Sequence, residues 1–186
     1  AARSPRIVIS GGAGFIGSAL VRELAQAGAT VLVIDDLSSG RLARLPQHPR
    51  VEILIADAGE VATWRRACAQ PWDAIVHLGE SAKASMIMVE RVAVNLRDSS
   101  VADNTGSMLR DVLVVDGGPA AHFATLPVRG FVEASIAVHV PAGLSLSAGT
   151  FLCNETMYRT LHALEGAGRS TVAGFVHVPQ LPEQAA

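Results

Sequence analysis

Short apolar runs alternate with amphipathic stretches through the first half of the chain. The run Thr30 to Asp35 is apolar almost throughout, as expected for a strand of a parallel sheet that is covered on both faces. Four such runs predict buried strands, at 6–10, 30–35, 51–56 and 73–78. The amphipathic stretches between them predict helices at 15–27 and 60–69, with a loop at 37–49. Strands that alternate with helices predict a parallel, right-handed wound sheet.

The second half has a less regular pattern. Strands are predicted at 89–96, 144–147 and 172–178, and helices at 126–137 and 150–164. The stretch 99–110 is loop-like, and 111–116 is predicted to be a further strand or a hairpin arm. We therefore expect an α/β fold of three layers, a mostly parallel sheet with helices on both faces. Residues 1–186 suit a single α/β domain of this kind.

Composition narrows the class of protein. Apolar residues make up 49% of the chain and charged residues 17%, which favours a compact fold over disorder. A net charge of -2 gives no reason to expect nucleic acid or an anionic membrane as a partner. No apolar run approaches the roughly 20 residues that span a bilayer. Homo-oligomers remain possible.

The two cysteines, Cys68 and Cys153, are too few for a disulfide framework and lack metal-ligand spacing. The chain start lacks the apolar core of a signal peptide. We therefore expect no metal site and a reducing, cytoplasmic location.

A glycine-rich turn follows the first predicted strand and opens the first predicted helix. Gly11 permits a tight turn, Gly14 lets the backbone approach a pyrophosphate, and Gly17 allows close packing of helix on strand. Asp35 ends the second strand, where a carboxylate can bind ribose hydroxyls, and Asp57 follows the third, where it could accept from an adenine amino group. The pattern indicates a Rossmann-like dinucleotide site.

Residues 6–78 resemble the NAD-binding half of extended short-chain dehydrogenases/reductases of the nucleotide-sugar epimerase and dehydratase type. The resemblance rests on GGAGFIG at 11–17, VIDDLSSG at 33–40 and DAIVHL at 73–78. It implies that Gly11, Gly14, Gly17, Asp35 and Asp57 bind NAD(P), with the acidic Asp35 favouring NAD.

That family reduces or oxidises through a Tyr followed four residues later by a Lys, and this chain has no such pair. The only tyrosine, Tyr158, is followed at that spacing by His162. Dehydrogenase or epimerase activity is therefore not expected.

A cysteine and a histidine in the second half have the surroundings of a catalytic pair. Cys153 lies at the start of a predicted helix, where the positive end of the helix dipole favours the thiolate. His177 ends the last strand and could serve as its base, and Glu90 offers a carboxylate to orient the imidazole. The alternative is structural roles, because a lone cysteine is more often a small buried hydrophobe.

Residues 79–186 resemble pyroglutamyl peptidase I, a family of cytosolic cysteine peptidases. The resemblance rests on SAGTFLCN at 147–154, FVHVP at 175–179, VERVAVNL at 89–96, GGPAA at 117–121 and ATLP at 124–127. It implies a Cys153 nucleophile, a His177 base and a Glu90 orienting carboxylate that remove an N-terminal pyroglutamyl residue without a cofactor. Phe151, Leu152 and Val101 would line the lactam pocket.

Parts of that family's pattern are missing. The glycine turn stands where the family has a Gly-Phe-x-Pro-Phe segment whose aromatics enclose the lactam. The family's Gly-Gln-Ala-Gly-Gly-Arg stretch is GESAKA at 79–84, and a family arginine is replaced by Ser100. The leading hypothesis is a weakened cysteine peptidase with a small peptide as ligand. The alternatives are an NAD-binding module without hydride chemistry, and a chimera, natural or engineered, with neither activity.

Overall fold

The computed structural model describes residues 3–82, 84–99, 106 and 108–180. The strands are β1 (Arg6–Ser10), β2 (Thr30–Asp35), β3 (Val51–Ile55), β4 (Ala74–Ser81), β5 (Ile87–Glu90), β6 (Val92–Val94), β7 (Ala121–Phe123), β8 (Ala142–Ser145) and β9 (Val172–Pro179). The helices are α1 (Phe15–Gln26), α2 (Val61–Ala67), α3 (Val128–Ala137) and α4 (Leu152–Gly166), and a 3-10 turn lies at Leu42–Arg44.

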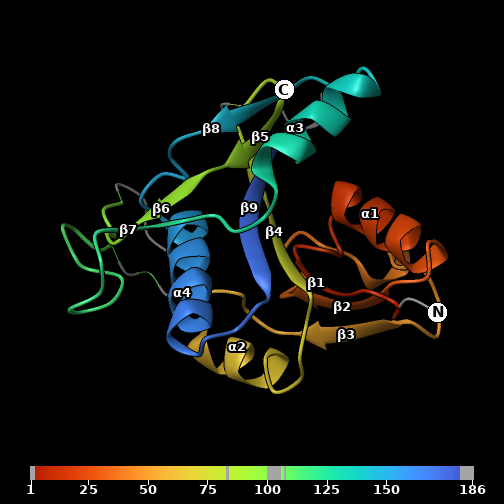
Figure 1. Cartoon of the computed structure of the whole chain (residues 1–186), viewed down its shortest axis with the longest axis horizontal. Coiled ribbons are helices and arrows are strands. Elements are labelled where there is room, and N and C mark those ends of the chain that lie inside the picture. The colour runs from red at the N-terminus through yellow and green to blue at the C-terminus, as the bar shows by residue number, and fades with distance from the viewer. Residues whose placement is uncertain (1–2, 83, 100–105, 107, 181–186) are drawn as a thin grey trace. The chain divides into compact units, whose positions relative to one another are not determined.

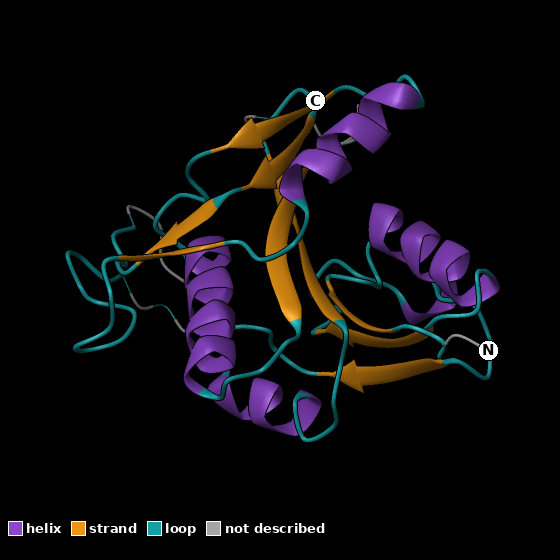
Figure 2. Ribbon diagram, in the orientation of Figure 1, coloured by secondary structure: helices purple, strands orange, loops and turns teal. Residues whose placement is uncertain are grey.

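A seven-stranded sheet has the order β3-β2-β1-β4-β9-β5-β8, and β6 pairs with β7 in a second sheet (Figure 2). In the larger sheet β1 is parallel to β2 and β4, β2 to β3, and β5 to β8, whereas β5 is antiparallel to β9. The predicted α/β fold with a mostly parallel sheet is confirmed. In the described part of the chain, no helix combines the length and the apolar character that crossing a membrane would take.

The chain divides into two compact units. The first comprises Ala1–Leu78 with Ser170–Val172, and the second comprises Gly79–Arg169 with Ala173–Ala186. The boundary after Leu78 coincides with the end of the first of the two sequence resemblances. The assignment of all 186 residues to a single domain stays a prediction.

The first unit is built on strands whose apolar runs are buried. Val8, Ile9, Val31 and Ile75 are fully inaccessible to solvent, and burial of each such side chain stabilises the fold by about 1.5–3 kcal/mol. The edge strand β3 differs, because Leu54 is buried while Ile53 and Ile55 are exposed. Gly28 follows α1 with a φ of 91°, a left-handed conformation that glycine commonly adopts just after the end of a helix.

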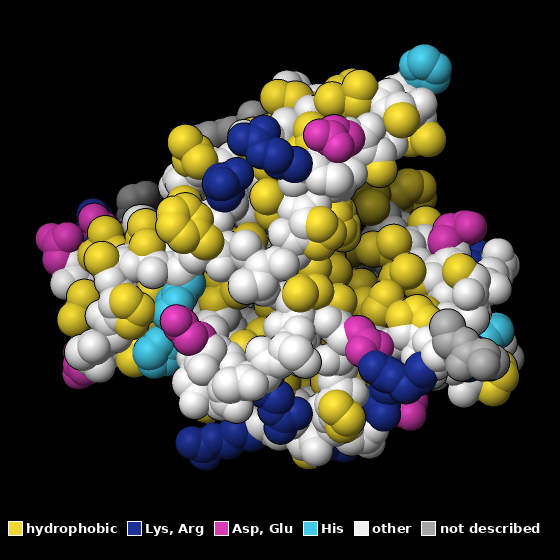
Figure 3. Space-filling model, in the orientation of Figure 1, with side chains coloured by type: hydrophobic (Ala, Val, Ile, Leu, Met, Phe, Trp, Pro, Cys, Tyr) yellow, Lys and Arg dark blue, Asp and Glu magenta, His cyan; other side chains and the backbone are white. Residues whose placement is uncertain are grey.

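The second unit places a small antiparallel sheet beside its longest helix. β6 and β7 both contact α4 (Figure 1), and Met157 and Tyr158 of α4 are fully buried. Helix α3 is different, because it has no fully buried residue. Ile136 lies exposed in its last turn and Val138 just beyond it, and hydrophobic side chains gather at the surface around this helix in Figure 3.

Several predictions for the second half are wrong. The strand predicted at 89–96 is interrupted at Arg91, whose N–H donates to Ser145 and whose carbonyl accepts from Ala124. The stretch 111–116 forms only an isolated bridge between Val112 and Arg97. The strand predicted at 144–147 lies two residues earlier, and strand β7 was not predicted.

Candidate active site

Cys153 lies in the first turn of α4. Gly149 precedes it with a φ of 78°, a left-handed conformation that glycine adopts without strain, and the chain enters the helix at Leu152. The first N–H groups of a helix have no partner within it, so the start of α4 carries partial positive charge. Cys153 is half-buried.

His177 and Glu90 come together from neighbouring strands. In the β5–β9 register Met88 lies opposite His177, and Nδ1 of His177 is 2.7 Å from Oε1 of Glu90. The Glu90 side chain is only 2% exposed and that of His177 is 12% exposed. Since Glu90 occupies Nδ1, Nε2 is the nitrogen left for the hydrogen bond that His177 also makes with Cys153.

The surroundings of His177 favour its charged form. Burial alone would lower its pKa, but the hydrogen bonds to Cys153 and Glu90 and the charges of these two groups outweigh burial and raise the pKa of His177 to about 9. The imidazolium is therefore held between two potential anions, which is the charge state that stabilises a thiolate.

Asn154 fixes the start of α4 to the strand that follows Glu90. Its side chain is fully buried; Oδ1 accepts from Val94 N–H at 2.8 Å, and Nδ2 donates to the carbonyls of Val94 (2.9 Å) and Leu96 (3.0 Å). The three bonds tie the residue after Cys153 to β6 and the segment beyond it. Sequence reasoning missed this role, although a polar side chain beside a candidate nucleophile was a signal for it.

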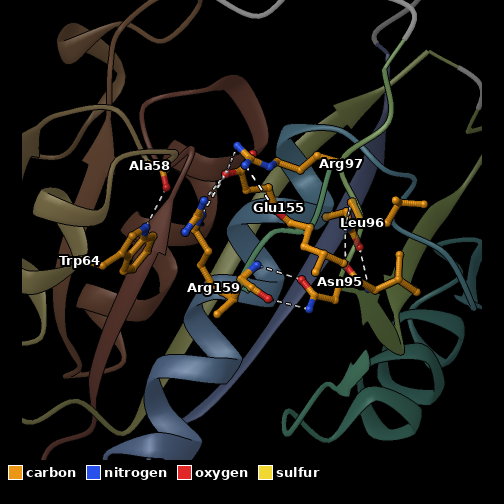
Figure 4. A network of polar contacts seen from close by, with 11 residues as sticks. Ala58, Trp64, Asn95, Leu96, Arg97, Glu155 and Arg159 are labelled. Atoms are coloured by element: carbon orange, nitrogen blue, oxygen red, sulfur yellow. Dashed lines mark hydrogen bonds and ion pairs between the residues drawn. The ribbon is translucent and has the colours of Figure 1, made fainter. Parts of the chain in front are cut away.

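Ion pairs of Glu155 connect the next turn of α4 to the segment that follows β6. The Glu155 carboxylate lies 2.8 Å from Arg159 and 3.5 Å from Arg97, and Figure 4 shows both guanidinium groups directed toward it. A backbone hydrogen bond adds a second tie, because the N–H of Asp98 donates to the carbonyl of Thr150 at 3.0 Å, two residues before α4 begins. The segment 95–98 is thus fastened to α4 by side chain and backbone.

The glycine turn of the first unit has the close approaches expected of a dinucleotide fingerprint. Gly11 has a φ of 75°, and a Cβ at Gly17 would lie 2.2 Å from the Gly11 carbonyl oxygen. Gly14 is less restricted, since the nearest atom to a Cβ there would be 3.3 Å away. The side chain of Asp35 accepts from the N–H groups of Ala13 and Leu37, both at 2.9 Å.

Asp57, the other predicted carboxylate of the dinucleotide site, and Tyr158, the only tyrosine of the sequence, both form hydrogen bonds within the protein. Asp57 is exposed and accepts from Gly59 N–H at 2.7 Å. Tyr158 is fully buried and donates to the Pro119 carbonyl at 2.6 Å, so its hydroxyl is committed to packing in the second unit. Lys83, the only lysine of the sequence, lies outside the described residues.

The profile of the family described as pyroglutamyl peptidase matches residues 54–186. The chain belongs to the pyroglutamyl peptidase family. A second profile, the NAD dependent epimerase/dehydratase family, matches residues 7–98 and overlaps the first. Both sequence resemblances are thereby found independently.

Relatives and solved structures agree with this membership. The chain is 44% identical over 126 residues to pyrrolidone-carboxylate peptidase of Pectobacterium atrosepticum, an alignment that covers 68% of this chain and 56% of the relative. It is 45% identical over 113 residues to that of Thermococcus kodakarensis, with coverage of 61% and 55%. The chain therefore spans about half the length of the curated relatives it matches.

The fold extends the likeness over nearly the whole chain. The crystal structure of pyrrolidone carboxyl peptidase from Fervidobacterium islandicum superposes with a TM-score of 0.72 at 27% identity, covering 97% of this chain and 84% of that one. A mutant of the Pyrococcus furiosus enzyme gives a TM-score of 0.73 at 28% identity, with coverage of 96% and 83%. These values include the first unit, despite its nucleotide-binding pattern.

Within this pyroglutamyl peptidase family member, the predicted pocket residues are only partly placed. Phe151 and Leu152 directly precede Cys153 and are half-buried, while Val101 and Ser100 lie outside the described residues. Glu80, which replaces the family's amide, is exposed and accepts from Gln180 at 2.9 Å. Among the described residues, no group of three or more His, Cys, Asp and Glu side chains could hold a metal ion.

Proposed function

We propose that this chain is a cysteine peptidase that removes an N-terminal pyroglutamyl residue. The observation that carries the proposal is the line of three groups, Glu90, His177 and Cys153, in which the central imidazole bonds to both partners. Cys153 is the nucleophile, His177 the acid and base, and Glu90 the group that orients the imidazole. Membership of the pyroglutamyl peptidase family supports the choice of substrate.

The proposed reaction passes through a thioester. The Cys153 thiolate attacks the carbonyl carbon that joins the pyroglutamyl ring to the next residue; the C–N bond then breaks as the His177 imidazolium gives its proton to the leaving amine. Water attacks the thioester while the neutral imidazole takes a proton from it. Release of pyroglutamate restores the thiolate and the imidazolium. No cofactor enters any step.

We expect this activity to be slow. The glycine turn occupies the place in the sequence where the family has the aromatic segment that encloses the lactam, and Glu80 replaces an amide. Loss of groups that position a substrate can lower the rate by about 100-fold. Because Glu90 and His177 are hydrogen-bonded to each other, we expect the loss to fall on the lactam pocket that we propose at Phe151, Leu152 and Val101.

Release of a fluorophore from a pyroglutamyl conjugate tests the proposal. Turnover should require a reductant and should fall to background in Cys153→Ala, because the nucleophile is lost. The matched control is Cys68→Ala, which removes the other cysteine of the chain and should leave turnover unchanged. Release that survives in Cys153→Ala, or its absence from a folded and reduced sample, contradicts the proposal.

We propose NAD binding by the first unit as a second candidate function. The close approach at Gly17 and the left-handed Gly11 support it, because this geometry brings the start of α1 to a pyrophosphate. Gly11, Gly14 and Gly17 would hold the phosphates, and Asp35 and Asp57 the nucleoside. The Asp35 carboxylate would have to share its present bonds to Ala13 and Leu37 with ribose hydroxyls.

Thermal unfolding with and without millimolar NAD tests this second function. NAD should raise the melting temperature of the parent protein, since a ligand that binds only the folded state stabilises it. Gly14→Val should abolish the shift, because it fills the phosphate approach without a backbone collision as severe as at Gly17. No shift at millimolar NAD contradicts NAD binding and leaves the peptidase proposal untouched.

A further inference from the structure

Gly79 lies against both an aromatic ring and the candidate nucleophile. A Cβ built on Gly79 would be 2.7 Å from Cζ and 2.9 Å from Cε1 of Phe175, and 3.4 Å from Sγ of Cys153. Contacts below 3.0 Å require something to move, and Phe175 is only 4% exposed, so its ring has little room. The absence of a side chain at residue 79 therefore allows the ring to occupy its observed position.

Phe175 in turn packs against the candidate base. The ring centroids of Phe175 and His177 are 4.7 Å apart with the planes at 44°, because residues two apart on a strand lie on the same face. On its other sides the imidazole bonds to Glu90 and to Cys153. A displacement of the Phe175 ring would thus be transmitted to an imidazole that must keep two hydrogen bonds at once.

We infer that Gly79 is a positioning residue of the peptidase site, and that it acts through Phe175 on His177. The inference rests on the proposed function for its catalytic meaning. Any side chain at residue 79 should push the Phe175 ring and misalign His177 between Glu90 and Cys153. The imidazolium–thiolate pair would be weakened as a result. The same Cβ would also be in ordinary van der Waals contact, at 3.4 Å, with the Sγ of Cys153.

The test measures alkylation of Cys153 by iodoacetamide as a function of pH, with the Cys153 peptide quantified by mass spectrometry. This readout reports the thiolate and its pairing with His177 without using a peptide substrate. Gly79→Ala should slow alkylation at pH 6.5 by at least about tenfold, because His177 would no longer lie where it activates the thiol. His177→Gln should do the same, whereas the control Gly166→Ala, whose Cβ would meet nothing within 4 Å, should match the parent.

A double-mutant cycle with Phe175→Leu separates transmission through the ring from a direct effect on the thiol. Leucine lacks the ring edge that a Cβ at residue 79 would meet, so Gly79→Ala should cost at least about tenfold in the parent and less than about twofold in the F175L background. Equal costs in both backgrounds overturn the inference, as does an unchanged pH profile in folded Gly79→Ala. If Gly79→Ala does not fold, restored folding in the double variant supports the inference and continued unfolding overturns it.

Failure of the proposed function would look different. A protein that releases no pyroglutamate yet alkylates Cys153 rapidly in a His177-dependent way would lose the substrate assignment while keeping the role of Gly79. A protein whose Cys153 reacts identically with and without His177 would lose the catalytic pair, and the positioning role would fall with it.

Discussion

Oε1 of Glu90 lies 2.7 Å from Nδ1 of His177, and the Glu90 side chain is almost completely shielded from solvent. An oriented, desolvated carboxylate stabilises an imidazolium far better than an exposed one does. The other oxygen, Oε2, has no hydrogen-bond partner within the part of the chain that the structure describes. The stabilising effect of Glu90 on His177 therefore passes through one contact.

Replacement of Glu90 by Gln should lower the pKa of His177. The imidazolium of the parent persists below about 9 and is lost as the pH rises through about 9; removal of the carboxylate charge removes part of that upward shift. The alkaline limit of the imidazolium should thus move to lower pH, and pyroglutamyl release should fall by about 100-fold or more. NMR titration of the imidazole protons measures the first effect, and Glu133→Gln, on an exposed carboxylate, should change neither.

Asn154→Ala should destabilise the second unit strongly. It would remove three hydrogen bonds and leave backbone groups of Val94 and Leu96 without their partner, at a cost of about 1–3 kcal/mol for each buried group left unsatisfied. Urea denaturation should show a loss of about 3 kcal/mol or more. Cys153→Ala changes the neighbouring residue and should cost far less, so similar losses for both variants would contradict the anchoring role.

His77 should make the first unit sensitive to acid. Complete burial lowers the pKa of His77 to about 3, below the ordinary value of about 6.5. Between these two pH values the imidazole is protonated in the unfolded chain and neutral in the folded chain. The free energy of unfolding is therefore unaffected by His77 above pH 6.5. It decreases as the pH falls toward 3, by up to about 1.4 kcal/mol per pH unit. His77→Asn should flatten the fall in unfolding free energy between pH 6.5 and 4.5, whereas exposed His139→Asn should leave it unchanged.

Gly17→Ala should damage the fold whether or not the protein binds a nucleotide. Its Cβ would meet the Gly11 carbonyl oxygen at 2.2 Å, a backbone atom that cannot rotate away, so we expect a loss of about 3 kcal/mol. Gly14→Ala, whose closest contact would be 3.3 Å, should cost about 1 kcal/mol or less. Equal melting temperatures for the two variants would show that the observed turn is not the folded conformation.

The sequence was most informative where one local pattern decides the structure. The strand at 30–35 has the predicted limits, and the first helix begins at the predicted Phe15, because an apolar run and a glycine turn mark them. The stretch 111–116 misled because its apolar residues suggest a strand. Instead, the Asn95 side chain bonds to both peptide groups of Val115 and takes the place of a neighbouring strand.

The candidate site was predictable as a set of residue types and not as an arrangement. Cys153, His177 and Glu90 were found through motifs, and the pairing of Glu90 with His177 depends on the register between β5 and β9. The contact of Gly79 with Phe175 depends on two strands far apart in the chain, so no local pattern could reveal it. Asn154 was overlooked because its partners lie about 60 residues away.

The hydrogen bonds that the Asp35 carboxylate accepts from its own backbone give this residue a structural role that does not depend on a nucleotide. The acidic residue that marks a nucleotide site in the sequence is also a fastening between the glycine turn and the loop after β2. Loss of this carboxylate would leave the N–H groups of Ala13 and Leu37 without their partner whether or not the chain binds a nucleotide. A dinucleotide fingerprint of this kind can therefore be required for folding in a protein that binds no nucleotide, so the pattern alone is better evidence of a local fold than of a ligand.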